Sequence, residues 1–472
     1  RRVLPFENDD GNECWIADRD RFSYEALDSA ERLTKPMLKQ GGQWVEVDWQ
    51  TALEYIANGV QCITKENGAG ALGALVSPHS TVEELYLAGA LMRGLGSPNL
   101  DYRLRHGDLR KPQGVRWLGR SVASLSQLQS VLVVGSNLRK DHPLFAQRIR
   151  QAARKGCTVL SIDNAVRDWA MPVAQTLVAN HGAWLQALAD VAAALAQEKG
   201  VSAPVAQGRA DEPTARAIAQ ALLRGEHKAV LLGNAAAHHA QASELLALAG
   251  WIAQQADATV GFLTEAANTV GAQWMQALPG EGGMDAAQML QGKLKGLFLL
   301  NNEPEFDSAA GAQAVAALGK VEMVVTLSPF KTNLEFSDVL LPIAPFTETS
   351  GSFVNAEGRL QSFHAVVRPL GETRPGWKVL RVLGNLLGLQ GFDFETSQDV
   401  LGRATGAAVG SVSHVPQELL SNAVADMPQS VQVVDVPAPA VASLYQLDGL
   451  VRRATSLQLT TDARLAREGV AA

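Results

Sequence analysis

Small polar residues follow four apolar stretches of this 472-residue chain, and they are the side chains best placed for chemistry. In a doubly wound fold, a glycine at a strand end lets the backbone approach a phosphate, and the following helix N-terminus favours an anion. The same residue types also permit tight turns without any ligand. Spacing alone leaves both interpretations open for four loops: Gly135–Asn137, Gly233–Asn234, Asn301–Pro304 and Gly351–Gly358.

One segment has the glycine spacing of a nucleotide-binding loop. Gly68-Ala-Gly70-Ala-Leu-Gly73 matches G-x-G-x-x-G, but it precedes an apolar stretch instead of following one. A dinucleotide fingerprint requires a strand before the glycines and a helix after them, and no G-x-x-x-x-G-K-[ST] loop occurs in the sequence. The sequence therefore does not support a nucleotide site of either kind.

Metal-binding and nucleophilic patterns are weak. Cys14, Cys62 and Cys157 lie far apart without C-x-x-C spacing, which is typical of reduced cytoplasmic thiols, although a disulfide or metal framework stays open as the alternative. His238 and His239 are neighbours, and neighbours on a helix point about 100° apart, so a loop or cap role is favoured. His79 and His106 have no Cys or carboxylate at metal-ligand spacing in the sequence.

Charge and hydropathy exclude some classes of partner. The net charge of −7 and the pI near 5.8 argue against a nucleic-acid partner, which requires a basic face. No apolar run approaches the roughly 18 residues of a membrane-spanning helix, so we expect no direct membrane span. A local basic run is either an anion-binding patch or an ion-paired surface; its members are Arg103, Arg105, Arg110, Lys111, Arg116 and Arg120.

The elements that must position these residues recur along the chain as a strand, a small polar residue and an amphipathic helix. Asp48 predicts an N-cap, and Thr81 or Ser80 predicts another for a helix from about residue 81 to 95. Pro143 predicts the first turn of a helix that ends near Gly156. Further strands are expected at 131–135, 158–163, 229–233, 296–300, 321–327 and 337–343. Fully apolar strands alternating with helices indicate parallel sheets covered on both faces, so the fold class is α/β with doubly wound sheets.

Three segments carry a family resemblance. The block Leu341–Gln361 resembles the "LP…E…GT…N.EGR.Q" block of the molybdopterin oxidoreductase superfamily, and Val131–Asp163 looks like its "GSNP…HP…RIR.A..KG..V..ID" unit. Asn301–Pro304 stands where the family often has a G-E-N-P turn. The resemblance implies two Rossmann-like domains and, in members with the molybdenum guanine-dinucleotide cofactor, loops that contact the dinucleotide. Leu138 replaces the family's proline, and Asn301-Asn302 replaces its glycine.

One branch of the superfamily fits best. The segments Arg1–Tyr24, Arg32–Met37 and Gly376–Leu389 are similar to the large iron–sulfur subunit of bacterial NADH:quinone oxidoreductase, respiratory complex I. This resemblance implies a non-catalytic scaffold within a translocase that passes electrons from NADH through iron–sulfur clusters to quinone and moves protons. It implies [2Fe–2S] and [4Fe–4S] clusters upstream of Arg1, the other peripheral-arm subunits as partners, including the NADH-binding ones, and the cytoplasmic side of the bacterial inner membrane.

The resemblance also bears on metal. Metal-bearing members need a Cys, selenocysteine, Ser or Asp ligand after the first βα unit, and Asn99–Arg110 contains no thiol. Asp101 and Asp108 could ligate, but acidic loop residues are usually solvated or ion-paired. Ala17 stands where some relatives have a cluster-binding cysteine, and Cys14 is a poor substitute. We therefore predict no catalytic, cofactor-binding or metal residues and no molybdenum, with a molybdopterin-binding oxidoreductase fragment and a nucleotide- or anion-binding module as alternatives.

Composition and the resemblance together suggest four segments. Residues 1–46 are expected to be the end of a small iron–sulfur-type domain. Residues 47–126 plus 255–395 form a first Rossmann-like domain, and 127–254 an inserted second one. Residues 396–472 are expected to be a linker and a tail that wraps a partner.

Overall fold

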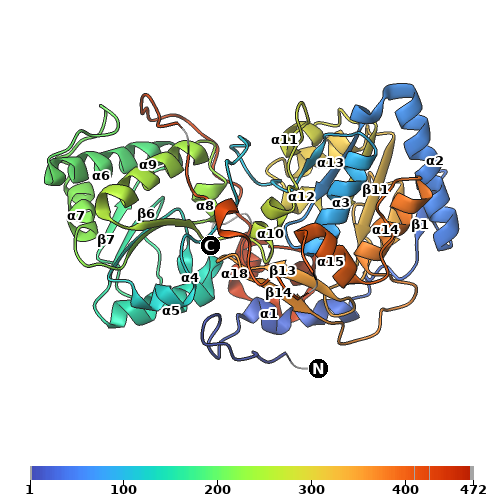
Figure 1. Cartoon of the computed structure of the whole chain (residues 1–472), viewed down its shortest axis with the longest axis horizontal. Coiled ribbons are helices and arrows are strands. Elements are labelled where there is room, and N and C mark those ends of the chain that lie inside the picture. Colours follow the sequence, from blue (N-terminus) through green and yellow to red (C-terminus); the bar gives the residue numbers. More distant parts are fainter. Residues whose placement is uncertain (1–2, 409, 425, 468–472) are drawn as a thin grey trace. The chain divides into compact units, whose positions relative to one another are not determined.

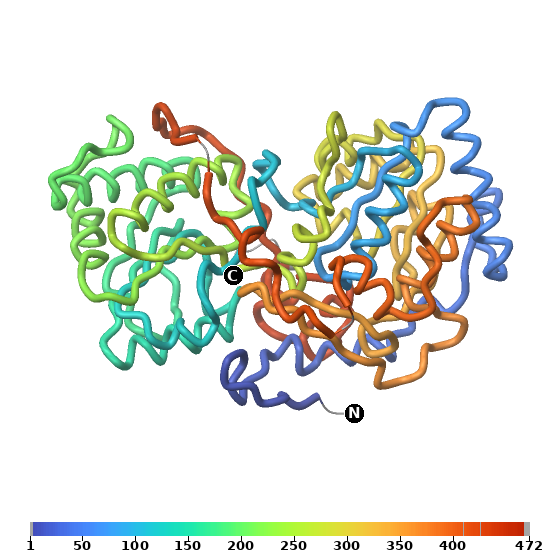
Figure 2. Tube along the Cα trace, viewed as in Figure 1, coloured from blue at the N-terminus to red at the C-terminus, as the bar shows by residue number. Residues whose placement is uncertain are grey.

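The computed structural model describes residues 3–408, 410–424 and 426–467. Arg1 and Arg2 of the N-terminal phrase, and residues 409, 425 and 468–472 of the predicted tail, lie outside the described residues. Two compact units make up the chain, and each combines segments distant in sequence (Figure 2). Unit 1 comprises Arg1–Arg21, Arg105–Glu265 and Pro416–Leu444, and unit 2 comprises Phe22–Leu104, Ala266–Val415 and Tyr445–Ala472. No helix in the described ranges is both long and apolar enough to span a bilayer.

Unit 1 contains a five-stranded sheet with the order β7-β6-β5-β8-β9, in which every neighbouring pair is parallel. Numbered along the chain this is the order 3-2-1-4-5 of dinucleotide-binding folds, which reverses between β5 and β8. The strands are β5 (Ser130–Val134), β6 (Thr158–Asp163), β7 (Gln175–Val178), β8 (Lys228–Leu232) and β9 (Thr259–Phe262).

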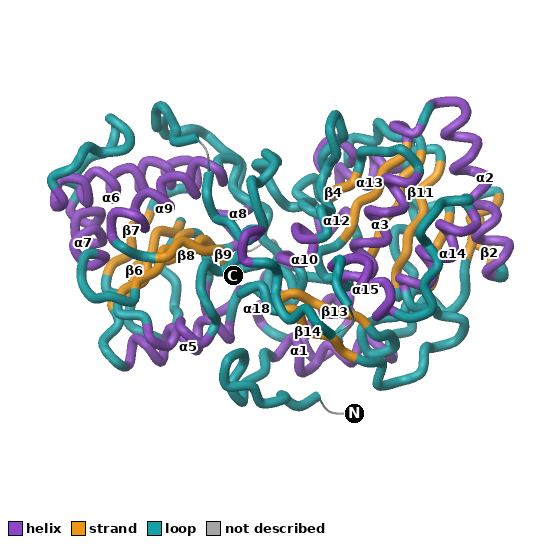
Figure 3. The backbone as a smooth tube through the Cα atoms, viewed as in Figure 1, coloured by secondary structure: helices purple, strands orange, loops and turns teal. Residues whose placement is uncertain are grey.

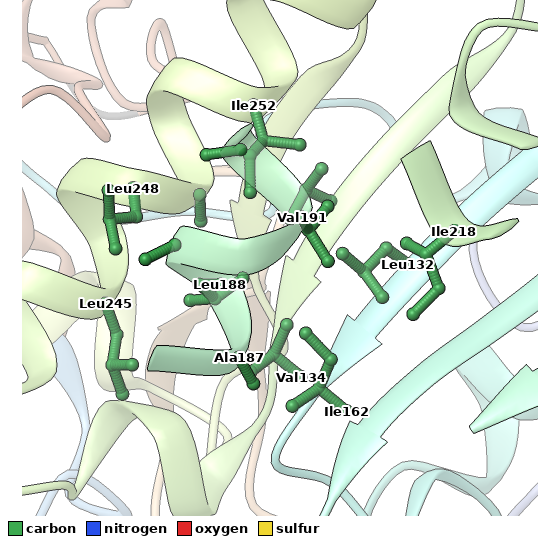
Figure 4. Packing of buried hydrophobic residues seen from close by; sticks show 14 of the residues in the cluster. Leu132, Val134, Ile162, Ala187, Leu188, Val191, Ile218, Leu245, Leu248 and Ile252 are labelled. Carbon is green, nitrogen blue, oxygen red and sulfur yellow. The ribbon is translucent and has the colours of Figure 1, made fainter. Parts of the chain in front are cut away.

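Helices cover both faces of the unit 1 sheet (Figures 1 and 3). On one side lie α6 (Trp184–Lys199), α7 (Pro213–Leu222) and α9 (Ala242–Ala256), and on the other lies α5 (Pro143–Arg154). Leucine and alanine side chains of α6 fill the space between the sheet and its neighbouring helices, with Leu188 and Val191 fully buried (Figure 4). Small residues on α6 allow the close helix packing that this core requires.

Unit 2 contains a seven-stranded sheet with the order β2-β1-β12-β11-β10-β3-β4. The five strands from β12 to β4 are parallel, and β1 and β2 add an antiparallel edge. In chain order the parallel part reads 2-1-3-4-5, which reverses between β3 and β10. The strands are β1 (Met37–Gln40), β2 (Gln43–Glu46), β3 (Leu72–Val76), β4 (Leu100–Asp101), β10 (Gly296–Leu300), β11 (Met323–Ser328) and β12 (Val339–Pro342).

Helix caps begin the main helices of unit 2 where the sequence places them. Asp48 accepts a hydrogen bond from the Thr51 backbone N–H at the start of α2 (Trp49–Asn67). Thr81 and Glu84 form a capping box at the start of α3 (Val82–Gly94). The remaining longer helices of this unit are α14 (Gly376–Leu386) and α15 (Ser397–Thr405), with the short α10 (Thr269–Trp274), α11 (Ala286–Met289), α12 (Pro304–Asp307) and α13 (Ala312–Leu318).

Smaller elements complete the two units. The hairpin β13 (Gly351–Val354) and β14 (Leu360–Phe363) carries the sequence block of the family, and unit 2 ends in α16 (Gly449–Arg453), α17 (Thr455–Gln458) and α18 (Thr461–Arg467). Short helices occur at α1 (Asp18–Phe22), α4 (Leu138–Asp141) and α8 (Asn234–Ala237), and 3-10 turns at η1 (Ser23–Asp28), η2 (Ala69–Ala71), η3 (Ala123–Gln127), η4 (His181–Ala183) and η5 (Gln417–Leu419).

The predicted α/β class with two parallel, doubly wound sheets is confirmed. Within residues 1–46, which we assigned to the end of a small N-terminal domain, β1 and β2 extend the unit 2 sheet. Their short alternating pattern was hidden by polar residues, which are tolerated on an edge strand. The tail predicted to wrap a partner packs on its own chain at Val451, which is 3% exposed, and its contact with a partner stays a prediction.

Candidate functional site

The candidate loops of unit 1 lie at the carboxyl ends of β5 and β8, where the strand order reverses and folds of this class place ligands. Gly135 has a φ of +63°, and a Cβ there would lie 2.7 Å from the Trp184 ring and 2.8 Å from the Ala236 backbone nitrogen. A Cβ on Gly233 would lie 2.3 Å from the Cβ of Ser136. Both glycines are therefore required because the two loops pack against each other.

Carboxylates line the same edge of unit 1. The Asp141 carboxylate accepts hydrogen bonds from the Asn137 backbone N–H (2.9 Å) and the Ser136 hydroxyl (3.4 Å). Burial raises the pKa of Asp141 to about 6. Asp163, at the end of β6, is also buried, and burial raises its pKa although Arg167 Nε lies 3.9 Å from its carboxylate. Asp163 occupies the strand end from which an acidic residue binds ribose hydroxyls in dinucleotide folds.

An extended segment, residues 431–440, lies over the loops that follow β7 and β8, and we call it the strap. Val434 donates its backbone N–H to the Gly182 carbonyl oxygen at 3.2 Å, so closely that a Cβ on Gly182 would lie 1.7 Å from the Val434 oxygen. The Ala440 carbonyl oxygen lies 2.8 Å from His238 Nδ1. Val431 belongs to the apolar core of unit 1 and is 3% exposed. The strap is thus part of the folded unit.

A buried ionic cluster of His238, Glu265 and Arg105 contacts the strap through His238. His238 Nε2 lies 3.1 Å from Glu265 Oε2, and Arg105 pairs with the same carboxylate. Burial alone would raise the pKa of Glu265, but electrostatic interactions and hydrogen bonds with His238 and Arg105 hold it well below its usual value. The His106 ring lies 4.8 Å from the ring of His238. These residues stabilise the unit around Glu265.

The predicted basic run is mostly ion-paired or bonded to the backbone. Arg110 pairs with Asp108 at 2.6 Å and also with Glu244. Arg116 donates to the Ala423 carbonyl oxygen at 2.8 Å, and Arg120 donates to Ser124 Oγ at 2.7 Å. Of the two interpretations, the structure favours the ion-paired surface for these residues.

In unit 2 the candidate loops follow β3 and β10, and hydrogen bonds join them. Ser77 donates its backbone N–H to the Leu300 carbonyl oxygen, and Asn301 Nδ2 donates to Ser80 Oγ at 3.0 Å. Asn301 has a φ of +53°, a conformation that asparagine tolerates better than most residues. Asn302 Nδ2 donates to the carbonyl oxygens of Leu75 and Leu300. The two asparagines therefore hold the loop ends together.

Polar residues of the family block Leu341–Gln361 are directed into the protein. Glu348 forms a buried bidentate ion pair with Arg32, with distances of 2.8 and 2.9 Å. Ser352 donates its backbone N–H and its hydroxyl to Glu83, each at 2.9 Å. Burial raises the pKa of Glu83 to about 7 and does the same for its neighbour Glu84. Asn268 Oδ1 accepts the Val354 backbone N–H at 2.8 Å.

The potential metal ligands are engaged elsewhere. Asp101 is fully buried and accepts hydrogen bonds from Arg103 Nε and Nη2, each at 2.9 Å, and from the Ala286 backbone N–H. Hydrogen bonds from Arg110 and Ser243 lower the pKa of Asp108 to about 2, against the effect of its burial. Across the described ranges, no three His, Cys, Asp or Glu side chains gather at a spacing that could hold a metal ion.

The cysteines and paired histidines take separate roles. Cys14 and Cys62 are exposed, whereas Cys157 is buried, which raises its pKa to about 12. His239 Nε2 lies 3.0 Å from the His181 carbonyl oxygen and its ring stacks on Trp184, so it helps to fix η4. His238 instead contacts the strap. The two histidines do not converge on one point.

Several known proteins are similar to this chain over most of its length. The molybdopterin oxidoreductase family profile matches residues 32–386, most of the chain. The chain belongs to the molybdopterin oxidoreductase family. It is similar to "Probable oxidoreductase YjgC" of Bacillus subtilis (25% identity, covering 85% of this chain and 48% of the relative) and to "NADPH-Fe(3+) oxidoreductase subunit alpha" of Geobacter sulfurreducens (27% identity, covering 78% and 51%). The chain thus spans about half the length of these relatives.

A solved structure shares the fold. Acetylene hydratase from Pelobacter acetylenicus aligns with a TM-score of 0.56 at 15% identity, over 83% of this chain and 67% of that protein. At this identity the likeness concerns the fold alone. The predicted superfamily is confirmed, whereas the narrower assignment to complex I is not shown by these relatives.

The family's dinucleotide cofactor fits these strand ends poorly. After β10, the carboxylates of Glu303 and Asp307 stand where a pyrophosphate would need cations or backbone N–H groups, and each is paired with an arginine of α16. In unit 1, Gly135 and Gly233 lie where the loops after β5 and β8 pack against each other, so these glycines serve loop packing. Asp163 would suit a ribose, but it does not supply a place for the phosphates.

The sequence did not predict the buried ion pairs of unit 2. The pairs Arg32–Glu348 and Arg453–Glu303 join residues 316 and 150 positions apart. The sequence contains one signal for the second pair, since Arg452 and Arg453 are adjacent in a tail with few large apolar residues. The position of their partners could not be read from the sequence.

Proposed function

We propose that this chain is part of the scaffold of the large iron–sulfur subunit of a bacterial NADH:quinone oxidoreductase. In this role it has no active site and supports the neighbouring cluster-bearing region, through which electrons pass from NADH to quinone. Its partners are the other peripheral-arm subunits, and it lies at the cytoplasmic side of the inner membrane. The chain would then serve a redox enzyme, as a member of the molybdopterin oxidoreductase family, without catalysing a step itself.

One observation supports this proposal most strongly: the acidic residue best placed to replace a metal ligand serves the fold. Asp101 is fully buried, forms an ion pair with Arg103 and accepts the N–H at the start of α11. To bind a metal it would have to leave a buried arginine without its partner, which costs several kcal/mol. The polar residues of the family block are likewise used within unit 2.

Metal analysis tests the proposal directly. The purified chain is analysed by inductively coupled plasma mass spectrometry, and the denatured, oxidised extract is measured for pterin fluorescence. We expect far less than one molybdenum, tungsten or iron atom per chain and no pterin signal. A stoichiometric metal or pterin would contradict the scaffold role.

Association provides the second test. The chain is tagged in its host and recovered from gently solubilised membranes. We expect NADH:quinone oxidoreductase activity to be recovered with the tagged chain. The same purification from cells that express the tag alone should recover no such activity. Recovery without such activity, in the presence of an intact enzyme in the same membranes, would count against the assignment.

A molybdopterin-binding oxidoreductase fragment is the second candidate function. Two observations favour it: the family relatives are named as oxidoreductases, and Asp163 lies at a ribose-binding strand end. Thermal unfolding with ATP, NADH and GDP separates it from a scaffold. A rise in melting temperature with GDP alone would support a retained guanine-nucleotide site, and no rise with any of the three would support the scaffold.

A further inference from the structure

The C-terminal residues Tyr445–Gln458, which include α16 and α17, pack on unit 2, and we call them the latch. Val451, Ala454 and Leu457 are 3%, 0% and 2% exposed. Gln458 Nε2 donates to the carbonyl oxygens of Tyr445 and Val451 at 2.9 and 2.7 Å, which closes the segment on itself. The latch is therefore an ordered part of the unit, with its own small apolar contact.

Arg453 connects the latch to the loop after β10. Its Nη1 lies 2.7 Å from Glu303 Oε1, and its Nε lies 2.6 Å from Glu31 Oε2. The guanidinium also lies 4.4 Å from the centre of the Phe330 ring, and the side chain is 10% exposed. A largely buried arginine with two carboxylates and an aromatic face is held much more firmly than a surface ion pair.

Arg452 makes a second connection to the same loop. Its two terminal nitrogens lie 2.8 and 3.1 Å from the oxygens of Asp307, and one of them also donates to the Gln446 carbonyl oxygen at 2.9 Å. The Arg452 side chain is 7% exposed. The acidic neighbours outweigh burial and raise the pKa of Arg452 above its ordinary value, so the residue stays charged.

The latch reaches the other strand end at the reversal as well. Asp448 caps α16 by accepting the backbone N–H groups of Leu450 and Val451 at 2.8 and 2.9 Å. Its second oxygen lies 3.6 Å from His79 Nδ1, in the loop after β3. The latch thus contacts both loops, after β3 and after β10, at the position where this fold class places a ligand.

The same segment holds residues from the beginning of unit 2. Ser456 donates its backbone N–H and its hydroxyl to the two oxygens of Glu25, each at 2.6 Å. Glu25 belongs to η1, and Glu31 follows η1 by a few residues. Through Arg453 and Ser456, the latch joins η1 to the strand-end loop.

We infer that the latch is a permanent intramolecular occupant of the unit 2 strand ends, and that it fixes η1 on this edge of the sheet. Its two guanidinium groups supply the charge that the carboxylates of Glu303 and Asp307 require. Because carboxylates line the loop, the surface beneath the latch suits a cation and not a phosphate. The latch therefore replaces a ligand and does not guard a site for one.

Hydrogen exchange in the full chain tests this inference. Arg453→Glu places a carboxylate against Glu303 and Glu31, so we expect backbone exchange to rise about tenfold or more in residues 445–458 and in η1 together. Exchange in β12 of unit 2 should not change, which shows that the sheet of this unit remains folded. Arg464→Glu, an exposed residue of α18 with the same change of charge, is the matched control.

A steric variant gives an independent route. A Cβ on Gly449 would lie 2.7 Å from Glu303 Oε1, so Gly449→Val pushes the Glu303 carboxylate away from Arg453 without changing any charge. This variant decides the question if Arg453→Glu unfolds the chain. Faster exchange in the latch with unchanged exchange in η1 would overturn the coupling. Binding of GDP by either variant, but not by the wild type, would overturn permanent occupation, because it would reveal a competent site beneath the latch. Coupled release without GDP binding is the expected result.

Discussion

The two units close the carboxyl ends of their parallel strands in different ways. In unit 1, Gly135 and Gly233 allow backbone to meet backbone, and the strap adds an extended cover that contacts Gly182 and His238. In unit 2, side chains close the edge through the ion pairs of Arg32, Arg452 and Arg453. The same fold class can thus cover its strand ends either by close packing of the backbone or by ion pairs.

The difference predicts that unit 2 is more sensitive to the loss of a single charge. Arg32→Ala leaves the buried carboxylate of Glu348 without its partner, so we expect the free energy of unfolding to fall by about 3–5 kcal/mol. Urea denaturation measures it. Lys35→Ala, which removes an exposed ion pair, should cost less than about 1 kcal/mol. Similar losses for both variants would contradict the importance we give to the buried pair.

Unit 1 should depend more on packing. Leu188→Ala removes a fully buried side chain from the core shown in Figure 4, and we expect a loss of about 2–5 kcal/mol. Thermal and urea denaturation check the value. Val178→Ala, at a position that is 52% exposed, is the control and should change stability by less than about 1 kcal/mol.

The contact between the loops after β5 and β8 in unit 1 predicts a smaller loss of stability. Its control variant is expected to change stability in the opposite direction. Gly233→Ala pushes a methyl group to 2.3 Å from Ser136 Cβ, so we expect destabilisation by about 1–3 kcal/mol. Gly250 lies within α9 and has open space around it, so Gly250→Ala should stabilise by about 0.5–1 kcal/mol. Differential scanning calorimetry distinguishes the two signs. Equal tolerance at both positions would indicate that the loops after β5 and β8 are not tightly packed.

The pH dependence of stability distinguishes two carboxyl groups, Glu83 in unit 2 and Asp108 in unit 1. Burial raises the pKa of Glu83 in unit 2 to about 7, so its folded form binds a proton that the unfolded chain releases near pH 4.5. The protonated Glu83 therefore stabilises the folded state fully below pH 4.5, and this stabilisation is lost as the pH rises through about 7. Asp108 in unit 1 has a pKa lowered to about 2, so its contribution is present above pH 3.8 and lost as the pH falls toward 2.

Urea denaturation between pH 5 and 8 tests this contrast. We expect Glu83→Gln to flatten the decline of wild-type stability across this range by about 2–3 kcal/mol. Asp108→Asn should leave the slope in this range unchanged, because Asp108 is ionised throughout it. An unchanged slope in Glu83→Gln would show that Glu83 does not bind a proton in the folded chain.

Much of the fold could be predicted because its signals are local. Asp48 and Thr81 begin helices as capping residues do, and the apolar stretch Gly296–Leu300 is the strand β10. The weakly apolar strands β1 and β2 escaped prediction, since a pattern of mixed polarity on a sheet edge resembles a loop. The strand-end loops were found, but their role was not, because a glycine at a turn and a glycine at a phosphate look alike in sequence.

The sequence alone predicts the order of the main apolar strands and their helices, the family to which the chain belongs and the absence of a thiol between Asn99 and Arg110. Those properties depend on neighbouring residues or on short motifs. The contacts of Asp101 with Arg103 and Ala286, and those of Arg453 with Glu31 and Glu303, became evident from the folded chain. The physical reason is that a charge is stabilised by whichever opposite charge the folded chain brings within a few ångströms, and separation along the sequence does not reveal that distance.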